Sequence, residues 1–475
     1  MINKIRFIEP GNFSRYKKSF KNIYTYNKYI KNPSTGLITL TTIAKKLVED
    51  TLMYSESISK IDFKDVYSSD IVFISINTYN AKRGYELCLN IRNNSKSIVV
   101  LGGMHASLNY LEAVEYADYV LMGDGDELIV DFINCMKEGR NIDFKGVVYK
   151  RGDIVINTGK REQPIDIDTI PNRSLVYNYS KLAKRYNTLW PQVHGSRGCP
   201  HNCDYCAVIQ HFGRKIRHRS PQSIVQDIKE AIEFHKIKFI PRLSNCVWIT
   251  DDNFAEDRDW AVSVLNEIIN SGIKYNFSVQ ARFEIGFDDE LLELMKKAGF
   301  IELALGIEFL DDDSFKEFHK KSNYDDIKKS IKNIQKHGIG VRGLFIVGAP
   351  IDTKGVGEKI ANYIIENNIH GCLIQSMFFT PGTKFYEENK HKLIHTNWEK
   401  YDGHVVHYPE NIKPYELQQE IIIALKKIYS VKRLLKAILF SKGIFKILFI
   451  GEFFWQREVI RNYKREVKFL KNIEI

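Results

Sequence analysis

The sequence predicts an α/β fold built from two successive parallel sheets and completed by a mostly helical C-terminal part. Short apolar strands alternate with helically spaced segments twice, first over residues 1–160 and again over residues 189–385. Residues 161–188 connect the two series, and helical patterns dominate residues 386–475. With 475 residues, 44% of them hydrophobic and 27% charged, the chain is long enough for two or three domains with full cores.

The first series predicts an open, Rossmann-like parallel sheet. Its segment Asp70–Ile76 is a continuous apolar run of the kind that is buried on both faces. Glycine-rich turns follow two later strands, at Gly102-Gly103 and at Gly123–Gly125, where a ligand could approach the backbone closely. The remaining elements are expected at Ile5–Ile8, Leu37–Val48, Thr51–Tyr54, Ala81–Ile91, Ser97–Leu101, Tyr119–Met122 and Glu127–Met136, with a hairpin over Lys150–Arg161.

The second series predicts a partial (β/α)6 barrel that begins near Val193. Polar residues or glycines follow several of its strands, and the carboxyl ends of barrel strands are where such folds carry their activity. For Asp251, Asp252 and Glu308 the alternative is helix capping in the strand–helix turns. The later strands are expected at Val247–Thr250, Tyr275–Val279, Glu302–Gly306, Gly343–Val347 and Cys372–Phe379.

Three closely spaced cysteines, Cys199, Cys203 and Cys206, follow the first strand of this second series. Three thiolates can hold one metal centre, but a closed zinc site or a fully ligated cluster needs four protein ligands. The other four cysteines are scattered singly, so one coordination position is expected to stay open. The alternative is a zinc site completed by a distant histidine, His194 or His201.

The spacing C-x3-C-x2-C, with Tyr205 before the last cysteine, resembles the signature of the radical S-adenosylmethionine (SAM) enzymes. The resemblance implies that the three thiolates hold a [4Fe–4S] cluster whose open iron binds SAM. One electron from the cluster then cleaves SAM to methionine and a 5′-deoxyadenosyl radical. Gly195 and Gly198 would let the loop turn around the cluster by adopting positive φ. The residues expected to bind SAM are Tyr205, Asp251, Gln280, Arg282, Glu308 and Gly343.

The first domain resembles the cobalamin-binding domain that precedes the barrel in a large subclass of this family. The family motif Asp-x-His-x-x-Gly, which often supplies a histidine to cobalt, is absent, although members of the subclass can bind cobalamin without it. The alternative is a degenerate Rossmann-like domain that binds no cobalamin. The residues that the resemblance assigns to cobalamin are Asn77, Thr78, Tyr79, Gly102, Gly103, His105, Gly123 and Gly125.

The C-terminal part resembles an extension found in one branch of the family, through the run Trp398–His404 and the helical segment Pro414–Tyr429. It is expected to cover the barrel mouth, which makes Tyr401, Asp402 and His404 candidate substrate-pocket residues. The alternative is that Trp398 and Tyr401 are packing anchors.

Positive charge is concentrated in two segments. The net charge of the chain is +11, and the residues from Lys432 onward carry eleven Lys or Arg against four Glu, a net of +7. If residues 431–455 form one basic amphipathic helix, it could lie on an anionic membrane or dock on the protein. The basic stretch His211–Ser220 could face the cluster and its cosubstrate, or it could be a turn facing phosphate or solvent.

The cysteine pattern does not form a disulfide framework, and no long apolar stretch predicts a signal peptide or a membrane span. A cytoplasmic location is therefore expected, with peripheral contact at the inner membrane surface through residues 431–455. The expected partners are a small-molecule or lipid-like substrate and a reductant such as flavodoxin or ferredoxin, and no nucleic-acid partner is expected.

The resemblance implies a radical SAM enzyme that uses cobalamin to methylate an unactivated carbon. A second interpretation keeps the radical but uses it for cyclisation, rearrangement or carbon–carbon coupling. A third, from another class, is an iron–sulfur protein for electron transfer or regulation without turnover. No residue pattern identifies the substrate.

Overall fold

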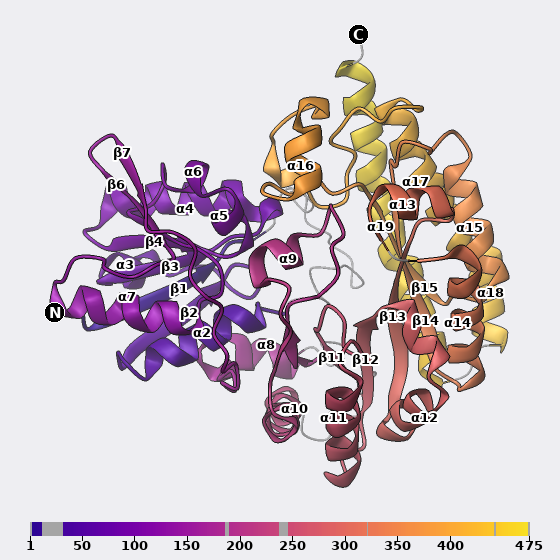
Figure 1. Cartoon of the computed structure of the whole chain (residues 1–475), viewed down its shortest axis with the longest axis horizontal. Coiled ribbons are helices and arrows are strands. Elements are labelled where there is room, and N and C mark those ends of the chain that lie inside the picture. Colours follow the sequence, from indigo (N-terminus) through magenta and orange to yellow (C-terminus); the bar gives the residue numbers. More distant parts are fainter. Residues whose placement is uncertain are drawn as a thin grey trace.

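The computed structural model describes residues 2–11, 32–185, 190–236, 246–320, 322–440 and 443–473. Two α/β bodies lie side by side, and the helical C-terminal part packs on the second (Figure 1). The cysteine loop and its helix α9 (Ala207–Phe212) lie between the two bodies.

The N-terminal body is a seven-stranded sheet in the order β2-β1-β3-β4-β5-β6-β7. Its first five strands are parallel, and the predicted hairpin forms the antiparallel edge pair β6–β7. The strands are β1 (Lys4–Glu9), β2 (Asp50–Ser55), β3 (Ile71–Ser75), β4 (Ile98–Gly102), β5 (Tyr119–Leu121), β6 (Val147–Arg151) and β7 (Ile154–Asn157).

Helices cover both faces of this sheet, as the apolar strand runs predict. Phe7 and Phe73 stack on one face with 4.9 Å between ring centroids, while Val72 and Ile74 belong to the core on the other. The helices are α2 (Thr35–Lys45), α3 (Phe63–Tyr67), η1 (Thr78–Asn80), α4 (Ala81–Asn94), α5 (Met104–Leu108), α6 (Tyr110–Ala113) and α7 (Asp126–Glu138), and the connection contains η2 (Arg173–Leu175) and α8 (Tyr179–Arg185).

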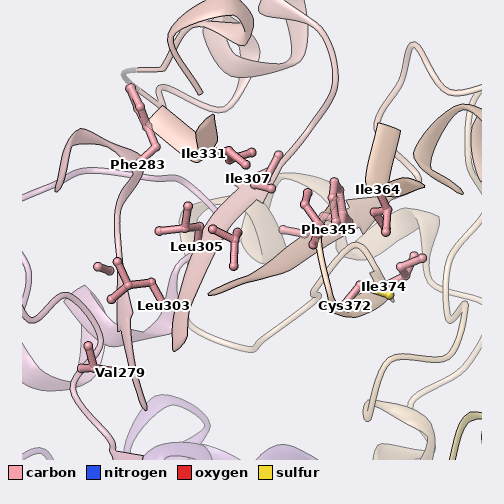
Figure 2. Packing of buried hydrophobic residues seen from close by; sticks show 14 of the residues in the cluster. Val279, Phe283, Leu303, Leu305, Ile307, Ile331, Phe345, Ile364, Cys372 and Ile374 are labelled. Carbon is pink, nitrogen blue, oxygen red and sulfur yellow. The ribbon is translucent and has the colours of Figure 1, made fainter. Parts of the chain in front are cut away.

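The second body is a parallel six-stranded sheet in the order β15-β14-β13-β12-β11-β8, which confirms the partial barrel. Leu303, Leu305, Phe345 and Ile374 of neighbouring strands form part of its core (Figure 2). The strands are β8 (Gln192–Val193), β11 (Cys246–Ile249), β12 (Asn276–Ala281), β13 (Phe300–Glu308), β14 (Gly340–Val347) and β15 (Gly371–Ser376), with a separate antiparallel ribbon of β9 (Ser196–Arg197) and β10 (Arg217–His218).

Helices follow the barrel strands as each βα unit requires. Ser220 caps the first helix after the ribbon, with a proline in its first turn, because both residue types suit a helix start. These helices are α10 (Pro221–His235), α11 (Arg258–Asn270), η3 (Phe283–Phe287), α12 (Asp289–Ala298), α13 (Asp312–Glu317), α14 (Tyr324–Lys336) and α15 (Val356–Glu366).

The C-terminal part packs on the barrel, and its last helix is held by buried charge. Arg342 of the barrel pairs with Glu302 at 3.2 Å and also with Glu452 of that helix. Tyr429 donates a hydrogen bond to Glu452 at 2.9 Å. The helices are α16 (Lys384–Asn389), η4 (Lys390–Lys392), η5 (Trp398–Lys400), α17 (Pro414–Ile428), α18 (Val431–Phe440) and α19 (Gly443–Ile473).

The expectation of one helix over residues 431–455 is wrong. The segment contributes to two helices, α18 and α19, which pack against each other, and Lys442 lies outside the described residues. Phe449 and Phe453 of α19 are buried in the barrel core because this helix docks on the protein. Among the described helices, none is long and apolar enough to cross a membrane.

Candidate functional site

The cysteine loop runs from β9 to α9, and its backbone is closed by local hydrogen bonds. Cys199 N donates to the Gly213 carbonyl at 3.3 Å, and Cys206 N donates to the Cys203 carbonyl at 3.0 Å. Gly198 has φ +95°, and a Cβ there would lie 2.4 Å from the Lys215 carbonyl oxygen, so only glycine fits.

Gly195 is needed for a different reason from the predicted one. Its φ is not positive, but a Cβ there would lie 2.9 Å from the Trp260 ring and 3.0 Å from the Asp251 carboxylate. The absence of a side chain, and not an unusual backbone angle, lets this strand end approach its neighbours.

Burial raises the pKa of all three cysteine thiols, that of Cys206 to about 12. The neighbouring cysteines raise the pKa of Cys206 further, because negative charges placed together repel. Such thiols become thiolates only beside a compensating positive charge, which an iron centre supplies. The donor set therefore fits a metal centre, and three soft ligands in one loop suit an iron–sulfur cluster.

The two histidines of the zinc alternative lie in other surroundings. In the described part of the chain, no three His, Cys, Asp or Glu side chains already converge as ligands of one metal ion. His194 is buried near three arginines, and His201 Nε2 lies 2.8 Å from the Glu256 carboxylate. A cuboidal cluster binds its thiolates through separate iron atoms, so it does not require convergence on one point.

Tyr205 and Glu308 meet beside the cysteines, together with a residue that the sequence did not reveal. The Tyr205 hydroxyl donates a hydrogen bond to Glu308, and Lys320 Nζ donates to the same carboxylate at 2.6 Å. Glu308 has φ +65°, an uncommon value for a side-chain-bearing residue that concentrates at functional sites. Lys320 follows no recognisable pattern, and only the fold brings it here.

The other residues expected to bind SAM have different environments. Asp251 accepts hydrogen bonds from Gly195 N at 2.6 Å and Ser196 Oγ at 2.7 Å, and burial raises its pKa to about 6. It therefore braces the strand that leads into the cysteine loop. Arg282 pairs with Glu284 at 2.7 Å, and its charge offsets part of the rise that burial causes in the pKa of Cys199 and Cys203.

Gly343 and Gln280 offer less to a ligand. A Cβ at Gly343 would lie 2.4 Å from the Phe345 ring, so this glycine makes room for the core. The Gln280 backbone carbonyl accepts a hydrogen bond from Phe254 N at 3.2 Å, and its side chain is half-buried. The capping alternative is wrong for Asp251 and Glu308, because Asp257 caps α11 and Asp311 caps α13.

The predicted cobalamin residues lie at the carboxyl ends of β3, β4 and β5, on the side of the sheet whose helix α5 contacts α9. At Gly102 and Gly123 a Cβ would make only ordinary contacts, at 3.8 Å from the Leu121 carbonyl oxygen and 3.8 Å from Gln163 Nε2, so neither position is crowded. At Gly103 and Gly125 a Cβ would lie 2.7 Å from the Ile76 carbonyl and 2.9 Å from Leu40, so these glycines serve internal packing.

The side chains of the β3 loop are better placed for a ligand than His105. Asn77 and Tyr79 are exposed, and Asn77 Nδ2 lies 3.5 Å from the Tyr79 hydroxyl. Thr78 Oγ1 lies 3.2 Å from His105 Nδ1. His105 is fully buried, and burial lowers its pKa to about 4. Its Nε2 has no hydrogen-bond partner within the described residues.

A pocket lies between Thr78 of the N-terminal body, the end of β15 and the C-terminal part. Ser376 in it is 1% exposed, and its hydroxyl has no hydrogen-bond partner in the described part of the chain. His404 Nδ1 bonds the Asp402 carboxylate, and the Tyr401 hydroxyl donates to the His395 carbonyl at 2.7 Å. We call this space the interdomain pocket; it is lined by Thr78, Ser376, Met377, Phe378, Phe379, Thr380, Tyr401, Gly403, His404 and Val406.

The basic stretch after the cysteine loop divides in two: Arg214 and Lys215 are exposed, as a solvent-facing turn would be, whereas the later arginines are buried. Arg217 and Arg219 are buried, and they pair with Asp124 at 2.6 Å and Asp227 at 2.7 Å. Arg214 donates to the Pro200 carbonyl at 2.9 Å. The sequence did not predict these ion pairs, because Asp124 lies far away in the chain, after β5, and Asp227 lies on α10.

Three cysteines after the first strand of a six-stranded partial barrel, with Tyr205 and Glu308 beside them, define a radical SAM domain. Residues 193–364 match the family model described as the Radical SAM superfamily. This part of the chain is therefore a radical SAM domain, the kind of domain that binds a [4Fe–4S] cluster and SAM.

Curated relatives align with most of the chain. Bacteriochlorophyllide d C-12(1)-methyltransferase of Chlorobaculum tepidum is 26% identical over 84% of this chain and 83% of its own length. Hopanoid C-2 methylase of Rhodopseudomonas palustris is 24% identical over 81% of this chain and 70% of its own. Anaerobic magnesium-protoporphyrin IX monomethyl ester cyclase of Cereibacter sphaeroides is 24% identical over 71% and 55%, respectively.

Solved structures share the whole architecture. The radical SAM methyltransferase TsrM of Kitasatospora setae, solved with cobalamin and a [4Fe–4S] cluster, has a TM-score of 0.66 at 15% identity, covering 82% of this chain and 75% of that one. The cobalamin-dependent SAM radical enzyme OxsB, solved with aqua-cobalamin and SAM, has a TM-score of 0.66 at 14% identity, covering 100% and 80%. Both confirm the predicted fold, from the N-terminal sheet to the C-terminal part.

Proposed function

We propose that this enzyme is a cobalamin-dependent radical SAM methyltransferase that modifies a carbon of a small, apolar or lipid-like molecule. The observation that carries the proposal is that the interdomain pocket is lined from both bodies, at the carboxyl ends of strands. Thr78 reaches it from the loop after β3, and Ser376 reaches it from the end of β15. Because ligands of parallel sheets bind at the carboxyl ends of strands, cobalamin and SAM would face one substrate there.

The N-terminal body fits cobalamin at the carboxyl ends of its strands. Gly102 and Gly123 lie there without crowding, and Thr78 adds a hydroxyl. TsrM and OxsB, which share this architecture, were solved with cobalamin. The bacteriochlorophyllide methyltransferase and the hopanoid methylase among the relatives support methyl transfer to a molecule of this class.

Each part of the site has a separate task. Cys199, Cys203 and Cys206 would hold the [4Fe–4S] cluster, which supplies the electron for SAM cleavage when bound. Tyr205 and Lys320 orient the Glu308 carboxylate, which would then accept hydrogen bonds from SAM. Phe378, Phe379 and Val406 exclude water from the substrate, while Ser376 and His404 offer hydrogen bonds to its polar groups.

The test is anaerobic reconstitution with iron, sulfide, SAM and dithionite, with Cys203→Ala as the matched control. We expect 5′-deoxyadenosine or methyl-transfer products from the wild type alone. Purification after growth with vitamin B12 should yield a coloured protein that retains cobalamin. A wild type that produces no more than Cys203→Ala, or that binds no cobalamin in titration, contradicts the proposal.

The cyclase among the relatives makes radical cyclisation the second candidate. The two candidates differ in one measurable product, because only methyl transfer moves the labelled carbon of [methyl-13C]SAM into the substrate. An electron-transfer or regulatory protein would give no SAM cleavage in either assay.

We also propose that α18 rests on an anionic membrane surface. Val431, Leu435, Ile438 and Leu439 recur at helical spacing, and they are 54%, 54%, 40% and 72% exposed. Exposed Lys432 and Lys436 flank this apolar face. Apolar side chains flanked by lysines are the pattern of a helix that lies in an anionic lipid interface. We further propose that the enzyme is cytoplasmic and lies at the inner surface of the membrane. We also propose that a flavodoxin or ferredoxin is its reductant.

Vesicle flotation tests the membrane contact. The wild type should float with vesicles that contain phosphatidylglycerol, and less of it should float with pure phosphatidylcholine vesicles. Little of a Leu435→Ser, Leu439→Ser double variant should float with either. The control is Ile154→Ser, because Ile154 is 70% exposed on the distant β6–β7 hairpin. Equal flotation of the double variant and the control contradicts the proposal.

A further inference from the structure

Four buried charged side chains join the two bodies of the molecule. Asp124 and Asp126 follow β5 of the N-terminal sheet, and Arg197 and Arg217 lie in the β9–β10 ribbon. None of the four is more than 8% exposed. We call this set the interdomain ionic cluster.

The contacts of the interdomain ionic cluster are direct and shared. Arg197 Nη1 pairs with Asp124 and, at 2.5 Å, with Asp126, while Arg217 Nη1 lies 2.6 Å from Asp124. Asp124 therefore bridges both arginines, whereas Asp126 accepts hydrogen bonds from Arg197 and also shares one with the neighbouring Asp124 carboxyl.

The two arginines hold the cysteine loop at both of its ends. Arg197 lies two residues before Cys199. Arg217 lies opposite Arg197 in the register of the antiparallel ribbon. Arg217 Nη2 also donates to the Phe212 carbonyl at 2.9 Å, at the end of the helix that starts after Cys206. Asp124 and Asp126 belong to the Gly123–Glu127 loop, which runs from the end of β5 into the first turn of α7.

Stability alone is a weak reason for such an arrangement. Removing charges from water costs about as much as their attraction returns, so buried ion pairs add little net stability compared with apolar contacts. Their directional hydrogen bonds do specify one geometry, because a bidentate or shared arginine fits its carboxylates in few orientations. The interdomain ionic cluster is thus suited to setting a distance.

We propose that the interdomain ionic cluster sets the separation and orientation between the [4Fe–4S] cluster and the cobalamin, with Asp124 as the principal positioning residue. The proposal rests on the proposed function, since it requires cobalamin in the N-terminal body. The Gly123–Glu127 loop then moves with the cysteine loop as one unit, and the two cofactors keep a single relative placement.

The test measures magnetic coupling between Co(II) and the reduced iron–sulfur cluster by electron paramagnetic resonance in the full-length, cofactor-loaded protein. Wild type should give one sharp splitting. Asp124→Asn should lose it or replace it with a broad distribution, and Asp126→Asn should change it less. The control is Asp131→Asn, which removes an exposed ion pair to Arg161 within the N-terminal body and should leave the splitting unchanged.

Iron content and the cobalamin absorbance separate the outcomes. A wild type that binds no cobalamin contradicts the proposed function itself. An Asp124→Asn protein that binds both cofactors with the wild-type splitting overturns the positioning role. Where Asp124→Asn fails to fold, Arg217→Lys decides, because it keeps the charge but loses the shared geometry; an unchanged splitting in Arg217→Lys also overturns the proposal.

Discussion

The indole ring of Trp398 stands edge-on against the imidazole ring of His105, with 5.1 Å between the ring centroids. Trp398 Nε1 also donates to Glu112 at 2.8 Å, so the C-terminal part is anchored on the N-terminal body. This confirms Trp398 as a packing anchor. The contact buries His105 and leaves no free face of its ring toward a ligand.

His105 should therefore not ligate cobalt. We expect His105→Gln to retain cobalamin and to leave the Co(II) electron paramagnetic resonance spectrum unchanged, since no ring nitrogen reaches the metal. The comparison needs wild type and variant loaded with the same cobalamin. A nitrogen splitting in the wild-type spectrum that disappears in the variant would show that His105 is a ligand.

The same residue should make stability depend on pH. Burial lowers the pKa of His105 from 6.5 to about 4, so the unfolded chain takes up a proton near pH 6.5 that the folded chain refuses. The free energy of unfolding should fall as the pH drops from 6.5 toward 4, by up to about 3 kcal/mol from this group. Denaturant titrations at pH 7 and pH 5 should show a smaller decrease for His105→Gln than for wild type, and parallel decreases would contradict this.

Tyr205→Phe should weaken SAM binding. The variant removes the hydrogen bond that orients Glu308, and a hydrogen bond to a charged group contributes about 2 kcal/mol. We expect the dissociation constant for SAM to rise about tenfold, which corresponds to about 1.4 kcal/mol, in anaerobic calorimetric titration. Tyr177→Phe, on the exposed connection, is the control. Equal affinities for SAM would exclude a role for the Tyr205 hydroxyl.

Phe453→Ala should destabilise the protein far more than Phe454→Ala. Phe453 of α19 is 6% exposed within the barrel core, whereas its neighbour Phe454 is 41% exposed. Truncating a buried phenylalanine costs about 4 kcal/mol, because it removes apolar contacts and leaves a cavity. Thermal unfolding of the two variants measures the difference. Similar melting temperatures would mean that α19 does not dock on the barrel in solution.

Local sequence pattern predicted most of the fold. Apolar strand runs such as Asp70–Ile76 depend on residues close in the chain, so their strands formed where expected, and the hairpin expected over Lys150–Arg161 formed a few residues earlier. The prediction of one helix over residues 431–455 was wrong because it, too, relied on local pattern alone. Helical spacing continues across that segment, but only contacts with the barrel decide where α19 packs and which face of α18 stays exposed.

The candidate site likewise contains residues that the sequence predicted and residues that only the fold brings together. The sequence alone determined Cys199, Cys203 and Cys206, because one short loop must supply all three thiols. The tertiary structure decided that Lys320 meets Glu308 and that Arg197 meets Asp124, which lies 73 residues away. Such partners carry no local periodicity, since long-range packing alone brings them together. The physical reason is that spacing along the chain encodes the loop, whereas its electrostatic surroundings come from segments of separate sheets and loops that only the tertiary fold brings together.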